Sequence, residues 1–106
     1  MTMHPLQGKW KILAHSSFGD LASSSEIIVQ GDRFHGVMQD ENSGKSYDIV
    51  NGKIDGNRFS LETSLSLVVF TVNVELEGLL SEDGRRITGT VTAMSKKGSF
   101  EGEKID

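Results

Sequence analysis

The sequence contains no cysteine, a single proline and no long apolar run. Without cysteine the chain can form no disulfide, and it offers neither a thiolate metal ligand nor a cysteine nucleophile. No stretch of about eighteen apolar residues occurs, and residues 1–5 show neither the basic nor the apolar region of a signal peptide. We therefore expect a cytoplasmic protein with no membrane span.

Basic residues are also scarce. Eleven Lys and Arg stand against fifteen Asp and Glu, which gives a net charge of −4 and a pI near 5.3. This is the wrong sign for binding a phosphate backbone. We interpret the pairs Arg85-Arg86 and Lys96-Lys97 as solvated flanks of turns. The composition therefore predicts no nucleic-acid partner.

The 106 residues suffice for one core, so residues 1–106 are expected to form a single domain. Turn-forming residues recur at short intervals, among them Asn51-Gly52, Asp83-Gly84 and Lys97-Gly98. The segments between the turns are β-branched or alternate between apolar and polar residues, as strands do. Eight strands are predicted, at 8–15, 23–30, 33–39, 46–54, 57–63, 67–79, 86–94 and 98–105.

The chain also resembles itself. Phe34, Phe59 and Ile87 each follow a turn and a polar residue, and they lie 25 and 28 positions apart. That spacing is typical of successive hairpins in an up-and-down meander. An open sheet would expose two edges, whereas closure removes them. We therefore predict an all-β fold, an up-and-down antiparallel meander closed into a small barrel.

Glycines share the predicted inward face with the apolar anchors. Strand alternation places Gly36 inward with Phe34, Gly89 with Ile87, and Gly102 with Phe100. Two interpretations stay open. Either the missing side chains leave a hollow lumen for an apolar guest, or the glycines mark bends and make room for large aromatic rings.

A tryptophan and a lysine are expected to meet where the barrel closes. Trp10 lies in Gly8-Lys9-Trp10 at the start of the first strand, and Lys104 lies at the end of the last. These strands pair in a closed barrel, so Lys104 should lie across the indole in a cation–π contact. The arrangement resembles calycin-type barrels (lipocalins, fatty-acid-binding proteins and avidins), whose short mark is Gly-x-Trp with a basic residue packed over it. The resemblance implies a lipocalin-like barrel.

Two further resemblances concern bacterial proteins. Residues 52–60, 78–91 and 100–102 resemble uncharacterised small bacterial proteins built from such hairpins, a likeness that implies a fold and no activity. The size and the acidic pair Asp40-Glu41 resemble, more distantly, lipocalin-like bacterial regulators of secretion genes. Those regulators hold a protein partner through an acidic surface loop.

Signatures of catalysis are lacking. His4, His15 and His35 show no metal-ligand spacing, and no nucleophile elbow or phosphate-binding loop occurs. Most carboxylates are expected in turns or on an exposed sheet face, where water hydrates them. Acid/base catalysis would instead need two of them held in an apolar pocket. We therefore predict no catalytic residue, no metal and no cofactor, and favour binding over catalysis. An isomerase or cyclase would need a polar pair inside the lumen.

Two functions stay open. In the first, the lumen holds a small apolar or aromatic ligand, with Tyr47 near its mouth and the walls formed by Trp10, Phe34, Met38, Phe59, Phe70 and Phe100. In the second, a filled barrel acts as a regulatory module through Asp40-Glu41 or an outer face at Leu65, Leu67 and Val69. That face would bind a second copy of the chain or a protein partner, unless the protein's own loops cover it. The size of the interior void distinguishes the two functions.

Overall fold

The computed structural model describes residues 4–16, 19–66 and 71–105, with residues 65 and 66 as backbone alone. Within these ranges the structure contains strands and no helix, so no described segment could cross a membrane as a helix. The strands are β1 (Gly8–Ser16), β2 (Gly19–Gln30), β3 (Arg33–Asp40), β4 (Ser46–Asp55), β5 (Arg58–Ser66), β6 (Thr71–Leu80), β7 (Arg86–Ala93) and β8 (Lys96–Lys104).

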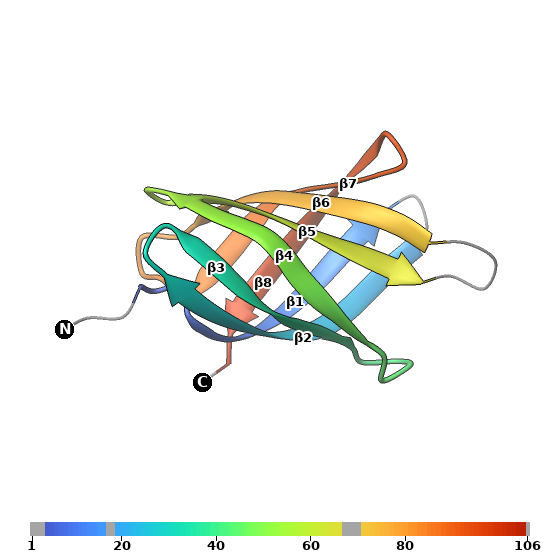
Figure 1. Cartoon of the computed structure of the whole chain (residues 1–106), viewed down its shortest axis with the longest axis horizontal. Helices are drawn as coiled ribbons and strands as arrows, with labels where there is room; N and C mark the ends of the chain where they lie inside the picture. Colours follow the sequence, from blue (N-terminus) through green and yellow to red (C-terminus); the bar gives the residue numbers. More distant parts are fainter. Residues whose placement is uncertain (1–3, 17–18, 67–70, 106) are drawn as a thin grey trace.

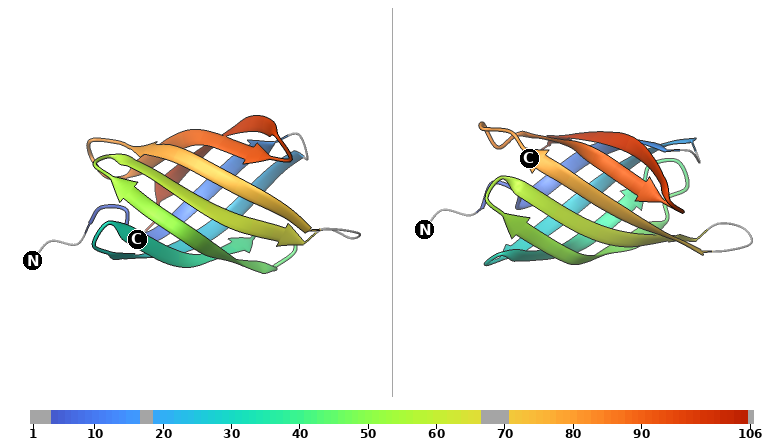
Figure 2. Two further views of the ribbon diagram at one scale, coloured as in Figure 1. Left: turned by 45° about the horizontal axis from the view of Figure 1, so that its top comes forward. Right: turned by 90° about the horizontal axis from the view of Figure 1, so that it is seen from above.

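Each strand pairs antiparallel with the next, and β8 pairs with β1 through partners such as Trp10 and Lys104. The sheet is therefore a closed barrel, which confirms the predicted fold (Figures 1 and 2). We call the end that carries the β2–β3, β4–β5 and β6–β7 turns the turn end; β1 begins and β8 ends there (Figure 1). The opposite end is called the loop end.

Two of the predicted turns lie inside strands. Lys97-Gly98 lies inside β8, and the β7–β8 connection is made by Met94 and Ser95, whose φ angles are 50° and 66°. A Cβ on Gly98 would lie 1.8 Å from the carbonyl oxygen of His15 in β1. The glycine is needed for the close approach of β1 and β8, and turn propensity alone could not distinguish that role from a turn.

Asn51-Gly52 also lies inside a strand. Asn51 has a φ of 53°, and the pairing of β4 with β5 shifts between Val50 and Lys53, so the pair forms a bulge. The amide of Asn51 donates to the carboxylate of Glu62 across this bulge. Bulges increase local twist, and twist helps a small sheet to close.

Aromatic rings fill the interior toward the turn end. Phe59 packs edge-on against Phe34 and Phe100, with ring centroids 6.3 and 6.2 Å away. All three are at most 5% exposed. A Cβ on Gly78 would lie 2.6 Å from the Phe59 ring and 2.7 Å from the Phe100 ring. In this half of the barrel, glycine provides space that the phenylalanines occupy.

The segment before β1 covers the turn end. Leu6 is 1% exposed, and its carbonyl oxygen accepts a 2.8 Å hydrogen bond from the indole Nε1 of the fully buried Trp10. Lys104 Nζ lies 5.7 Å from the Trp10 ring centroid and donates to the carbonyl oxygen of Pro5 at 2.7 Å. The predicted cation–π contact is confirmed, and one cation links β8 to the covering segment.

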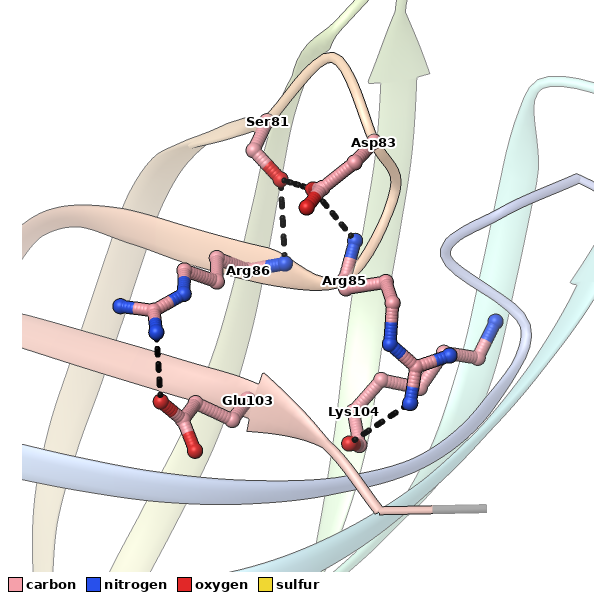
Figure 3. A network of polar contacts seen from close by, with 6 residues as sticks. All are labelled: Ser81, Asp83, Arg85, Arg86, Glu103 and Lys104. Carbon is pink, nitrogen blue, oxygen red and sulfur yellow. Dashed lines mark hydrogen bonds and ion pairs between the residues drawn. The ribbon is translucent and has the colours of Figure 1, made fainter.

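The β6–β7 turn adds a polar network at this end (Figure 3). Asp83 Oδ1 accepts from the Ser81 hydroxyl at 2.5 Å and from the Arg85 N–H at 3.1 Å. Arg85 also donates to the Lys104 carbonyl, and Arg86 lies 3.3 Å from Glu103. The turn is thereby connected to the end of β8.

This turn should make stability depend on pH. The hydrogen bond from Ser81, then that from Arg85 N–H, lowers the pKa of Asp83 below its ordinary value of 3.8. The unfolded chain therefore takes up this proton first, so the contribution of Asp83 to stability is fully present well above pH 3.8 and is lost as the pH falls through the lower, folded pKa. The free energies of urea unfolding of the wild type and Asp83→Asn should differ more at pH 6 than at pH 3. Glu82→Gln controls for charge, and an equal difference at both pH values would contradict the assignment.

Candidate functional site

The interior toward the loop end contains a cavity of about 140 Å³. An engineered apolar cavity of about 150 Å³ binds benzene, so this volume suits one aromatic ring. The described walls are mostly apolar and come from every strand except β8. Their apolar and aromatic residues are Ala14, Leu21, Met38, Tyr47, Val72, Val74, Leu76, Val91 and Ala93.

Side-chain volume explains why the cavity lies at this end. The inward face of β1 runs from Trp10 through Ile12 to Ala14, and that of β7 ends at Ala93. The inward residues of β1 therefore become smaller toward the loop end, where β7 also contributes a small residue. Because the turn end is filled and covered, the described structure leaves the loop end as the route of entry.

Two of the hydroxyl residues that line the cavity are almost fully buried. Ser23 and Thr63 are 2% and 3% exposed. Among the described residues, none provides a hydrogen-bond partner for Thr63 Oγ1, whose neighbours across the sheet are Val74 and then Ala93. Thr63 is thus a buried polar group facing a mostly apolar space.

The charged residues in the described lining are Asp20 and Asp40. Asp20 Oδ1 lies 2.9 Å from Nδ1 of His15, and Asp40 accepts hydrogen bonds from the Asn42 N–H and the Ser43 hydroxyl. These contacts hold both carboxylates at the strand ends that form the mouth. Such a mouth disfavours anionic ligands.

The structure brings only some of the predicted lining residues to this cavity. Met38 and Tyr47 line it, whereas Trp10, Phe34, Phe59 and Phe100 are buried but are not part of its described lining. Phe70 lies outside the described residues. Contact of any of these residues with a ligand stays a prediction.

Sequence reasoning missed the small residues of the wall. Ala14, Ser23, Thr63 and Ala93 all lie on inward faces, within two to four residues of the loop-end terminus of a strand or at that terminus. Strand alternation could have placed each of them inward. Nothing in alternation shows that four strands bring small residues to the same end.

The predicted interaction surface is only partly described. Leu67 and Val69 lie outside the described residues, and Leu65 is described by its backbone alone, which pairs with Val72. Asp40 is at the cavity mouth. Glu41 accepts from the Ser24 hydroxyl at 3.2 Å and lies 3.9 Å from Lys11 Nζ on the outer surface. A partner at this surface stays a prediction.

Metal-ligating clusters are not found among the described residues: no group of three or more His, Asp or Glu is placed to hold an ion. The described outer grooves are lined mainly by polar and charged residues of both signs, as between β4 and β6. The partly enclosed cavity at the loop end is therefore the best-defined site for a small molecule.

Comparison with known proteins identifies a fold. No family model and no curated protein matches the sequence. Among solved structures, the redesigned β-barrel mFAP0, bound to DFHBI, is 11% identical, with a TM-score of 0.67 over 96% of this chain and 100% of the other. The chain shares the fold of these closed β-barrels.

Two more designed barrels give the same result. The redesigned barrel mFAP1, also bound to DFHBI, has a TM-score of 0.66 at 11% identity, over 95% of each chain. A fluorescence-activating β-barrel designed de novo has a TM-score of 0.62 at 12% identity, over 93% of each chain. At such identities the likeness concerns the fold and not the residues of a site.

Proposed function

We propose that this protein is a small lipocalin-like binding protein, which holds a small apolar or aromatic molecule in the cavity at the loop end. The observation that carries the proposal is a partly enclosed, mostly apolar space of about 140 Å³, in a barrel whose other half is filled. A void of this kind weakens packing unless a guest occupies it.

Two further observations support this function. The described lining combines apolar walls with a few polar groups, as ligand sites commonly do. The contact of Lys104 with Trp10 agrees with the calycin resemblance, and designed barrels of the same fold have been solved with a bound compound. The alternative, a module acting through its outer surface, fits the filled half of the barrel but gives no role to the cavity.

Direct binding measurements test the proposal. Native mass spectrometry of the protein as isolated, and ligand-observed NMR with toluene and phenol, should show one bound molecule per chain. Ring compounds too large for about 140 Å³ should bind more weakly. If neither compound binds and the isolated protein carries nothing, the outer-surface function becomes the better explanation.

Filling the cavity should abolish binding without harming the fold. Ala93→Leu adds three carbon atoms at a wall residue that is 4% exposed, so we expect at least a tenfold weaker toluene affinity and a stability change of about +0.5 to +2 kcal/mol. The control is Ala22→Leu, at the half-buried neighbour of two lining residues on β2. Isothermal titration and thermal unfolding measure both effects. Unchanged toluene affinity in Ala93→Leu would place the ligand elsewhere.

A further inference from the structure

We propose that the ligand is a neutral single-ring compound with a small hydrogen-bonding group, of the phenol class, and that this group pairs with Thr63 Oγ1. The inference rests on the proposed function and specifies its ligand. Three features of the cavity support this ligand class: the buried hydroxyl of Thr63, the volume of the cavity and the sign of the charges at its mouth.

The hydroxyl of Thr63 is the first argument. Thr63 is 3% exposed, lines the cavity, and finds no partner for Oγ1 among the described residues. A buried hydroxyl without a partner is costly, whereas a hydrogen bond from a ligand would satisfy it. The directly opposite residue in β6 is Val74, which shows that a branched apolar side chain fits this layer of the barrel. The hydroxyl is therefore the feature of Thr63 that packing does not explain.

The volume limits the rest of the ligand. A space of about 140 Å³ holds one ring with little more than a single small substituent. A hydroxyl group meets that limit, and it can both donate to and accept from Thr63.

The acidic residues at the mouth favour a neutral polar group on the ligand over an anionic one. Asp20 and Asp40 are the charged residues in the described lining, and both are acidic. A carboxylate entering past them would lose hydration and meet charges of its own sign. A neutral hydroxyl meets neither penalty, so phenols are favoured over benzoates.

The test compares phenol and toluene, which have nearly the same shape. In the wild type, phenol should bind at least as tightly as toluene, and benzoate should bind at least tenfold more weakly than phenol. In Thr63→Val the ratio of phenol affinity to toluene affinity should fall about tenfold, because toluene needs no partner. Thr63→Ser should keep most of the wild-type ratio, since it retains the hydroxyl.

Two further variants complete the design. Thr90→Val removes a hydroxyl from the exposed face of β7 and should leave the ratio unchanged. If Thr63→Val folds poorly, Thr63→Ala provides the same comparison with a smaller side chain. Binding of both compounds with an unchanged ratio in the Thr63 variants would overturn this inference and leave the proposed function standing. Failure of both compounds to bind the wild type would overturn the proposed function itself.

Discussion

Replacing Gly89 by alanine should destabilise the barrel by about 3 kcal/mol or more, which lowers the unfolding midpoint by at least about 10 °C. A Cβ at this position would lie 2.0 Å from the carbonyl oxygen of Glu77 and 2.6 Å from the Cα of Gly78. Both are backbone atoms of β6, so no side-chain rotation relieves the overlap. The strand pair must separate or the barrel must deform.

Gly102→Ala is the matched comparison for that prediction. Its Cβ would lie 2.8 and 3.0 Å from the side chain of Ile87, which can move, and 3.1 Å from the backbone carbonyl oxygen of Lys11, a much milder overlap than the 2.0 Å at Gly89. We expect Gly102→Ala to lower the free energy of unfolding by about 1 kcal/mol. Thermal and urea unfolding followed by circular dichroism measure both. Equal stability of Gly89→Ala and the wild type would show that β6 and β7 need no such close approach.

Trp10→Ala should lower the free energy of unfolding by about 3–5 kcal/mol, the usual range for removing a fully buried indole. The substitution removes the largest fully buried side chain. It also removes the indole N–H that donates a hydrogen bond to the Leu6 carbonyl oxygen. It also removes the ring beneath Lys104. The covering segment would lose its main contacts at the turn end.

Trp10→Phe separates packing from hydrogen bonding. A phenyl ring retains much of the apolar contact but cannot donate a hydrogen bond to the Leu6 carbonyl oxygen. Trp10→Phe should therefore lose clearly less stability than Trp10→Ala. Because Trp10 is the single tryptophan, unfolding must be followed by circular dichroism instead of emission. A loss below about 1 kcal/mol for Trp10→Ala would mean that the turn end does not depend on the indole.

Much of the fold could be predicted from local patterns. Alternation of apolar and polar residues located the strands, and the repeat at Phe34, Phe59 and Ile87 indicated a meander. The contact of Lys104 with Trp10 followed once closure was assumed, because closure pairs the first strand with the last. The turn predicted at Gly98 was wrong, since a glycine needed for close strand approach looks the same in sequence as a turn glycine.

The sequence by itself determined which side chains face inward, since alternation within a strand is a local property. Only the tertiary structure decided where the interior is full and where it is empty. Strand tilt and stagger bring Phe34, Phe59 and Phe100 together, the last two over Gly78, and they bring Ala14, Thr63 and Ala93 to the other end. A cavity is the difference between the enclosed space and the summed volume of side chains from many strands, so no single segment encodes it.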